Sequence, residues 1–464
     1  MAACDDFTRS HLLRASIAAA GNGLPATEPG MPLPAGTGLT RRSVLLRGAG
    51  LALTVYGAGR AIAPQAFEAA VAEAAGEQKV LVSIFMDGGA DALSLLAPTG
   101  DARYTALRPQ LALPAGAGFA FDADPRLRWH PSAQGLQELW DDPGVGVAVA
   151  PAIGYDHPNQ SHFTSRHFWE VGATDPAGTT GWLGRYLDRV GSPDVPIQGL
   201  SLSDTLSPTL ATSSVAVAAT TNLDSYRFQA DGVWGTMQTR MQSTFAALGA
   251  LPASDPITAQ ARQVQANAAG LAADLASVGS GAPPAGAAYP APSSAFKTRL
   301  QGLARLLATV DGGGNALPLR CVTLSAQGGY DTHSAQAADF SDNLLATAGN
   351  LRAFWRDLQL RGVADRVVVT LWSEFGRRPA ENGSAGTDHG AAGAAFVMGT
   401  GVRQGLIGEF PGLAAGSGLD EEGNLRATSD FRGLYCSLLE QWFQTDAAGI
   451  IPSAASFARP VLIG

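Results

Sequence analysis

The segment Val80–Met86 reads VLVSIFM, and Asp87-Gly88-Gly89-Ala90-Asp91 follows it directly. An unbroken apolar run of this length, closed by an Asp-Gly-Gly turn, is typical of a strand that is buried on both faces. Other runs along the chain have the same form. They span residues 145–150 (VGVAVA), 320–325 (RCVTLS), 367–372 (VVVTLW) and 395–398 (AFVM).

Segments with a helical period alternate with these runs, at 255–278, 335–360 and 431–443. Apolar strands that alternate with helices predict an α/β fold, with a mostly parallel central sheet and helices on both faces. The Gly-, Pro- and Ala-rich stretch 279–294 separates two halves, but both halves supply strands of the same kind. We therefore expect residues 76–464 to form a single α/β domain with an inserted helical and loop region at about 200–300.

The N-terminal region carries the pattern of an export signal. Thr40–Leu46 reads TRRSVLL, and no charged residue stands between Gly48 and Gly59. An arginine pair before a weakly apolar, Gly-rich core is typical of a twin-arginine signal, and this core is too short to span a bilayer. The alternative is a buried helix that happens to follow two arginines.

From this pattern we expect residues 40–75 to be a signal peptide and residues 1–39 to be a disordered or mis-called extension. The twin-arginine translocation machinery is then a partner, and the protein is periplasmic, attached to the cell envelope or secreted. No later apolar stretch reaches membrane-spanning length, so we expect no membrane span in the mature protein.

The net charge bears on the class of partner, and the cysteines bear on disulfide bonding. The net charge of −9 argues against a nucleic-acid partner, because such partners need a basic surface. Of the cysteines, Cys4 precedes the signal, whereas Cys321 and Cys436 belong to the mature chain. These two are either buried thiols or a disulfide pair, and the sequence leaves both open.

Polar motifs follow the predicted strands directly: 87–91 (DGGAD), 328–333 (GGYDTH) and 373–377 (SEFGR). In open parallel sheets, ligands bind outside the carboxyl ends of the strands, so these motifs are expected to converge. A further Asp/His pair lies in 386–390 (GTDHG). The Asp-Gly-Gly turn lacks the full glycine spacing of a dinucleotide site, so no such site is predicted.

Carboxylate and imidazole groups in this arrangement indicate a site for a divalent metal, which we take as Zn, Mn, Mg or Ca. Arg377 is the candidate for a bidentate clamp on a small anionic ester substrate. The predicted metal ligands are Asp91, Asp331, His333, Glu374, Asp388 and His389.

Ser161, in the segment 159–163 (NQSHF), has two interpretations. It is either a nucleophile activated by a metal or by His162, or the N-cap of a helix that begins at about Phe163. His157 and His167 are interpreted as structural.

The order and number of these motifs resemble the exported bacterial family called domain of unknown function 1501, a branch of the alkaline phosphatase/sulfatase-like superfamily. The resemblance implies an alkaline phosphatase-like α/β sandwich with a metal-assisted hydrolase site at the strand ends. The motifs that carry it are Gly88–Asp91, Ser161–Phe163, Trp169–Gly172, Gly181–Leu183, Gly328–His333, Ser373–Arg377, Glu381–Gly383 and Gly386–Gly390.

Carried over by motif, the resemblance places the first-strand carboxylate at Asp91 or Asp87. It places the nucleophile near Ser161, a ligand pair at Asp331 and His333, and the last histidine at His389. Where the superfamily has Asp-His after the next strand, this chain has Glu374-Phe375. That pair offers one ligand in place of two, which makes one metal or none the expectation.

The sequence therefore predicts an exported metal-dependent hydrolase of phosphate or sulfate esters. The alternative is a non-catalytic cell-envelope binding protein that retains the alkaline phosphatase-like fold. Glu374-Phe375 in place of Asp-His favours the alternative, and the Asp/His pairs at the other strand ends favour the enzyme.

Overall fold

The fold was analysed in a computed structural model. It describes residues 31–33, 35, 54–56, 78–192, 195–221, 223, 233–276, 278, 281–310 and 316–464. The predicted arginine pair and most of the predicted signal core lie outside these residues. Of that core, residues 54–56 are described and form β1 (Thr54–Tyr56), which pairs antiparallel with β8 (Val217–Ala219).

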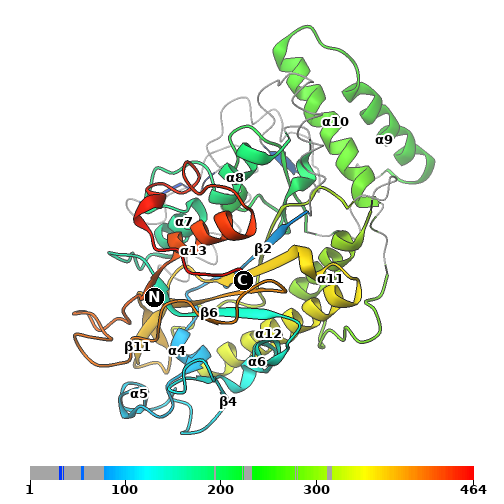
Figure 1. The fold of residues 1–464 in the computed structure, drawn as a ribbon. Helices are drawn as coiled ribbons and strands as arrows, with labels where there is room; N and C mark the ends of the chain where they lie inside the picture. Colours follow the sequence, from blue (N-terminus) through cyan, green and yellow to red (C-terminus); the bar gives the residue numbers. More distant parts are fainter. Residues whose placement is uncertain are drawn as a thin grey trace.

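A large mixed sheet forms the centre of the molecule (Figure 1), in the order β1-β8-β7-β9-β2-β10-β13-β6-β14, with β15 also on β6. Most neighbours run parallel, whereas β1 is antiparallel to β8 and β13 is antiparallel to both β10 and β6. Its remaining strands are β2 (Val80–Phe85), β6 (Gly146–Gly154), β7 (Gly199–Ser201), β9 (Cys321–Ser325), β10 (Val367–Trp372), β13 (Gly393–Gly399), β14 (Gly405–Leu406) and β15 (Ser429–Asp430).

Helices cover both faces of this sheet, as the sequence predicted. Val82 and Ile84 of β2 belong to one apolar core, and Leu81 and Phe85 belong to the other, because successive strand residues point to opposite faces. The first core is closed by α6 (Gln134–Asp141), α11 (Ala295–Ala308) and α12 (Gln336–Leu360). The second is closed by α7 (His162–Val171), α8 (Trp182–Val190), α13 (Phe431–Ser437) and the π-helical turn Leu438–Trp442.

The smaller elements lie around this sandwich. They are α4 (Ala92–Leu95), α5 (Ala102–Leu107), the small sheet β3 (Leu96–Ala97), β4 (Phe119–Ala120) and β5 (Arg128–Trp129), and the hairpin of β11 (Arg377–Glu381) and β12 (Thr387–His389).

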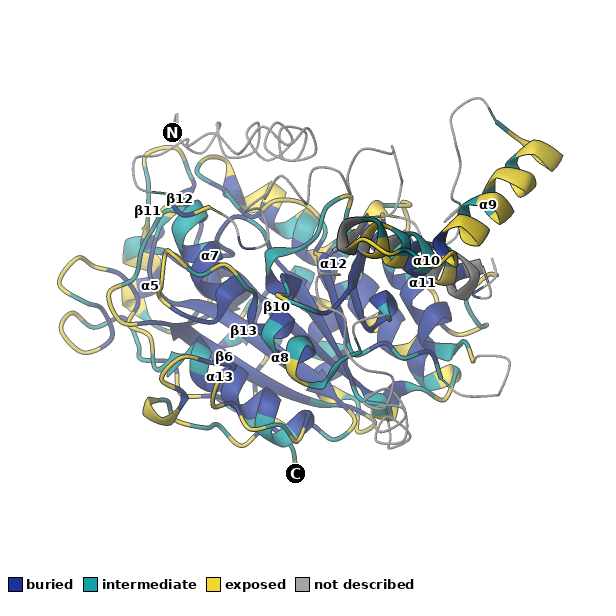
Figure 2. Cartoon of the chain, turned by 90° about the horizontal axis from the view of Figure 1, so that it is seen from above, coloured by how far each residue is buried: buried dark blue, intermediate teal, exposed yellow. Residues whose placement is uncertain are grey.

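The inserted region is narrower than 200–300, because β8 lies in that range and is a strand of the central sheet. Within the part of that range that the structure describes, α9 (Gly235–Gly249) and α10 (Pro256–Ala276) pack against each other at one side of the molecule (Figure 1), and α10 also contacts β1 and the turn Pro196–Gln198. Figure 2 shows a contrast in burial, with a deeply buried sheet and an exposed α9.

Two further expectations can be compared with the structure. Cys321 and Cys436 are both buried and unpaired, as in the first of the two alternatives. Among the described residues, no helix has the length and apolar character needed to cross a membrane.

Candidate metal centre

The parallel strands β9, β2 and β10 lie side by side, so their carboxyl ends share one edge of the sheet. The antiparallel strand β13 begins at this edge, directly after the hairpin that carries His389. The loops after β2, β9 and β10 and the end of β12 therefore meet there, together with the start of α7.

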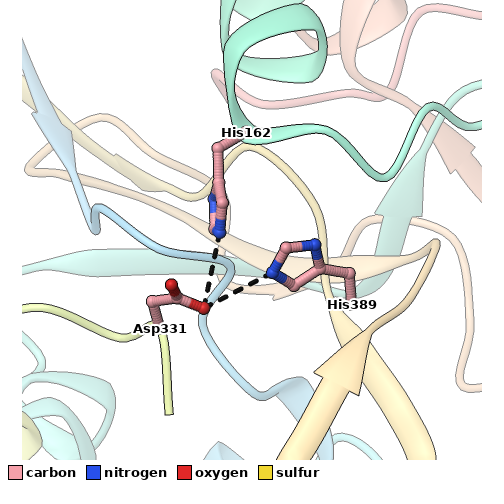
Figure 3. A group of neighbouring side chains, drawn as sticks. All are labelled: His162, Asp331 and His389. Atoms are coloured by element: carbon pink, nitrogen blue, oxygen red, sulfur yellow. Dashed lines mark hydrogen bonds and ion pairs between the residues drawn. The ribbon is translucent and has the colours of Figure 1, made fainter. Parts of the chain in front are cut away.

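Asp331 stands at the centre of a cluster of imidazoles at this edge (Figure 3). Its Oδ1 atom lies 3.4 Å from Nε2 of His162, 3.1 Å from Nε2 of His333 and 3.4 Å from Nε2 of His389. The Nε2 atoms of His333 and His389 are 2.9 Å apart. The structure thus brings Asp331, His333 and His389 together and adds His162, which was not among the predicted ligands.

The other ring nitrogen of each histidine faces a group that accepts hydrogen bonds. Nδ1 of His162 lies 2.7 Å from a carboxylate oxygen of Glu374, and Nδ1 of His333 lies 3.3 Å from a carboxylate oxygen of Asp388. Nδ1 of His389 lies 2.7 Å from the backbone carbonyl of Gln160. Since ionised carboxylates and carbonyls cannot donate, each Nδ1 carries the proton.

With each Nδ1 proton held in this way, Nε2 is the nitrogen of each ring that faces the Asp331 carboxylate. Three imidazole nitrogens and a carboxylate oxygen this close together need positive charge among them, either from protons on Nε2 that donate to Asp331 or from a metal ion that replaces them. Ligands held about 2.0–2.1 Å from one tetrahedral zinc ion lie about 3.3 Å apart. The three distances from Asp331 to the imidazoles and the distance between His333 and His389, 2.9 to 3.4 Å, are close to that value. The ligand atoms of His162, Asp331 and His389 all lie within 4.8 Å of one another. The donor set therefore fits a divalent metal ion.

Asp331 is ionised in this setting. Burial alone would raise its pKa, but hydrogen bonds with His162, His333 and His389 outweigh burial and hold the pKa well below its usual range. Arg377 adds a contact of 2.5 Å from its NH2 atom to the same Oδ1.

Glu374 was predicted as a ligand, and the structure places it behind His162 instead. Its carboxylate is fully buried and accepts hydrogen bonds from the backbone of Gly88 and Gly89, at 3.0 Å each, and from Ser373 Oγ. Gly88 has φ +111° and no room for a Cβ, which would lie 2.3 Å from the Asp331 nitrogen. Histidines that bind metals commonly donate their other nitrogen to such a carboxylate, which fixes the ring orientation.

Phe375 follows Glu374 and stands where the superfamily has the histidine of its Asp-His pair. It packs against two of the imidazoles. Its ring centroid lies 4.8 Å from that of His162 and 4.8 Å from that of His389. The Glu374-Phe375 pair therefore supplies an orienting carboxylate and an apolar wall in place of two ligands.

Asp388 contacts His333 on the outer side of the cluster, much as Glu374 contacts His162 on the inner side. Its side chain is mostly exposed, and one oxygen contacts both His333 Nδ1 and Asn382 Nδ2, the latter at 3.0 Å. The hydrogen bond from Asn382 lowers the pKa of Asp388, with a further contribution from His333.

Arg377 does not fit the predicted role of an anion clamp. Its guanidinium is buried and all three of its nitrogens are engaged: Nε with the carbonyl of Gly89, NH1 with that of Thr387, and NH2 with those of Gly88 and Tyr330 and with Asp331. Because these partners belong to the protein itself, Arg377 joins the loops of the site and leaves no nitrogen for a substrate.

Asp91 is also placed differently from the prediction. It is fully buried, and both of its oxygens pair with Arg108, at 2.5 and 2.9 Å. Burial disfavours the charged form, but Arg108 outweighs it and lowers the pKa of Asp91. Its oxygens also accept from Ser94 and Gln336, so we assign Asp91 a structural role.

Asp87, the other first-strand carboxylate, lies nearer the cluster. Burial raises its pKa to about 6, partly offset by Arg166, whose NH1 lies 3.8 Å from its carboxylate. Electrostatic interactions with Glu374 and His162 also act on this carboxyl, so Asp87 lies beside the cluster.

Ser161 occupies the N-cap position of α7, and its side chain makes no capping hydrogen bond there. His162 is the first residue of this helix and is buried. The signal for His162 was its place beside Ser161 in a polar loop after β6. His167 is buried and contacts the carbonyl of Asp175, in keeping with a structural role.

Several solved structures are similar to this chain. The C-terminal periplasmic domain of EptC from Escherichia coli, in complex with Zn, is 8% identical with a TM-score of 0.34, covering 80% of this chain and 84% of that one. The integral membrane protein lipooligosaccharide phosphoethanolamine transferase A (EptA) from Neisseria meningitidis is 11% identical with a TM-score of 0.35, covering 88% and 61%. A protein in the alkaline phosphatase superfamily from Vibrio parahaemolyticus is 10% identical with a TM-score of 0.29, covering 79% and 66%.

No curated protein matches the sequence. A family described as proteins of unknown function, DUF1501, matches residues 124–449, which is well over half of the chain. The clustered residues His162, Asp331, His333 and His389 all fall within the matched range. The chain belongs to the DUF1501 family.

Proposed function

We propose that this protein is an exported hydrolase of phosphate or sulfate esters that works with a divalent metal ion. The observation that carries the proposal is the set of three imidazole Nε2 atoms that lie 3.1 to 3.4 Å from one carboxylate oxygen of Asp331, with each Nδ1 held by an acceptor. The ester class comes from the resemblance of the sequence motifs to the alkaline phosphatase/sulfatase-like superfamily.

The residues that would hold the metal are His162, Asp331, His333 and His389. Three imidazoles with one carboxylate favour Zn²⁺ over Mn²⁺, Mg²⁺ or Ca²⁺, which prefer oxygen ligands. A bound divalent ion would polarise a phosphoryl or sulfuryl oxygen as a Lewis acid.

The chain's own groups have defined tasks around that ion. Glu374 and Asp388 hold the protons on Nδ1 of His162 and His333, which keeps Nε2 of both rings as a lone pair. The N-terminus of α7 begins at His162, so its partial positive charge favours an anionic ester at this point. Arg377 is occupied, so we assign the positive charge for the substrate to this helix end and to the metal.

Ser161 is the candidate nucleophile. It directly precedes His162, and its backbone N–H donates to the side chain of Asn159 at 2.8 Å, which fixes the loop at the helix start. Gln160 and His162, on either side of Ser161, both contact residues of the cluster, so Ser161 lies beside the metal-binding residues, as the nucleophile interpretation requires.

Export by the twin-arginine machinery is part of the same proposal. It rests on the arginine pair at Arg41-Arg42 before an uncharged, Gly-rich segment. A metal site assembled from three separate segments of the chain needs a folded chain, and the twin-arginine route carries proteins that are already folded.

The test of this function is a turnover screen on the zinc- or manganese-loaded protein, with phosphate monoesters, phosphate diesters and sulfate esters. We expect turnover of one class that a chelator abolishes and that Ser161→Ala loses without loss of fold or metal. Ser294→Ala is the matched control, because Ser294 caps α11 through Lys297 N and should cost only about 1 kcal/mol of stability.

Other outcomes lead to different conclusions. Full activity in Ser161→Ala would keep the hydrolase and exclude Ser161 as the nucleophile. No turnover of any class by the wild type would overturn the hydrolase and favour the non-catalytic envelope binding protein.

A further inference from the structure

A buried polar network lies next to the metal-binding cluster and contains none of its ligands. Arg108 and Asp91 are fully buried, and Gln336 is 1% exposed. Removing two charges and an amide from water is costly, so a network of this kind is expected to have a structural or positional function.

The orientation of the Gln336 amide is fixed by its neighbours. Its Nε2 donates to Asp91 Oδ2 at 2.5 Å, and Asp91 can only accept because its pairing with Arg108 keeps it ionised. Gln336 Oε1 must therefore be the acceptor on the other side of the amide. It accepts from the hydroxyls of Thr332, at 2.9 Å, and Thr387, at 2.6 Å.

These two threonines belong to the two segments that carry most of the predicted ligands. Thr332 stands between Asp331 and His333 in the loop after β9, and Thr387 opens the strand β12 that ends at His389. The segments also meet through their backbones, since Thr387 N donates to Thr332 O at 3.1 Å. One carboxamide oxygen thus holds both segments at a fixed separation.

Arg108 hydrogen-bonds to β11, the other strand of the hairpin. Its Nε donates to the carbonyl of Pro379 at 2.8 Å, and its NH2 donates to that of Arg378 at 3.1 Å. Both carbonyls lie on β11, which pairs with β12. The hairpin that presents His389 is therefore fastened on both of its strands.

We propose that Gln336, oriented by the Arg108–Asp91 pair, is a positioning residue that sets the spacing between Asp331, His333 and His389 and so sets the affinity for the divalent ion. This inference rests on the metal site of the proposed function. Groups that orient metal ligands typically change metal affinity by about 10- to 100-fold when they are removed.

The test measures Zn²⁺ affinity of the full chain by competition with a chromophoric chelator, together with urea unfolding of the metal-free protein. Gln336→Met keeps the length of the side chain and removes its hydrogen bonds, and it should weaken Zn²⁺ binding by about 10- to 100-fold. Gln198→Met is the matched control. Gln198 is also buried and hydrogen-bonded, to Ser192 and Ala216, but it precedes β7 at the opposite edge of the sheet.

A pair of variants at Thr387 keeps the test decisive if Gln336→Met does not fold. Thr387→Val removes the hydroxyl with little change in shape and should weaken Zn²⁺ binding, whereas Thr387→Ser keeps the hydroxyl and should retain the wild-type affinity. A purely structural role would lower the stability of the Gln198 and Gln336 variants alike and leave Zn²⁺ affinity unchanged in both.

The outcomes separate this inference from the proposed function. Wild-type affinity in folded Gln336→Met, or in folded Thr387→Val, overturns the positioning role and leaves the metal site standing. Failure of the wild type to bind Zn²⁺ or Mn²⁺ overturns the metal site and this inference with it.

Discussion

Glu374→Gln probes how the protein prepares His162 for a metal. The substitution keeps the shape of a fully buried side chain, so it creates no cavity. It replaces an acceptor-only group by one with an NH2 face. In the wild type, His162 Nδ1 and Gly88 N contact one carboxylate oxygen, and Gly89 N and Ser373 Oγ contact the other, all at 2.7 to 3.0 Å. The new NH2 group must therefore face one of these two pairs of groups, whichever way the amide is turned.

The size of the effect follows from these contacts. Hydrogen bonds to a charged group contribute about 1.5–3 kcal/mol each, and removing one member of a buried ionic contact costs about 3–5 kcal/mol. We therefore expect the free energy of unfolding to fall by about 3 kcal/mol. If the amide nitrogen faces His162, the imidazole shifts its proton to Nε2, and Zn²⁺ binding should weaken by about 10- to 100-fold.

Urea unfolding of the metal-free protein and Zn²⁺ competition titration measure the two effects separately. Asp357→Asn is the control, because Asp357 is a fully buried carboxylate on α12 that bonds Arg361 and Tyr289 away from the cluster. It should lose stability and keep its metal affinity. Glu374→Gln with the stability loss but wild-type Zn²⁺ affinity would refute the orienting role.

Three further expectations concern the other corrected or untested residues. Arg377→Lys should lower the free energy of unfolding by about 3 kcal/mol, because one ammonium group cannot bond the buried carbonyls of Gly88, Gly89 and Thr387 together. A variant of wild-type stability that differs only in substrate affinity would instead support the role of Arg377 as an anion clamp. Asp91→Asn should destabilise the protein, and its free energy of unfolding should differ most from that of the wild type above pH 3.8, the ordinary carboxyl pKa. Because folding lowers the pKa of Asp91, this difference should shrink as pH falls through the lower folded-state pKa. A difference that stays constant with pH in urea titrations would contradict this. Arg41→Lys combined with Arg42→Lys should hold the precursor in the cytoplasm in a fractionation assay, and efficient export of the double variant would remove the basis for the export proposal.

The fold was predictable because its central strands are apolar on both faces. The predicted runs at 80–86, 145–150, 320–325 and 367–372 correspond to β2, β6, β9 and β10. β7 and β8 escaped prediction because three-residue strands carry too little periodicity to stand out, and their range was taken as part of the insertion.

The site was predictable in its location and less so in the roles of its residues. Polar motifs at strand ends predicted that Asp331, His333 and His389 lie together, as they do, because parallel strands bring their carboxyl ends to one edge. Arg377 and Asp91 were misassigned because their partners, backbone carbonyls and Arg108, are set by tertiary packing that a motif does not reveal. His162 was named as a possible activator of Ser161 but not as a ligand, because its place beside Asp331 and Glu374 depends on contacts between segments that are far apart in sequence, 212 positions in the case of Glu374.

Anomalous diffraction at the zinc edge, from crystals of the zinc-loaded protein, tests the central claim most directly. The account predicts one peak per chain, about 2 Å from Nε2 of His162, His333 and His389 and from the Asp331 carboxylate. A fully loaded crystal with no peak at these four residues would contradict the metal centre.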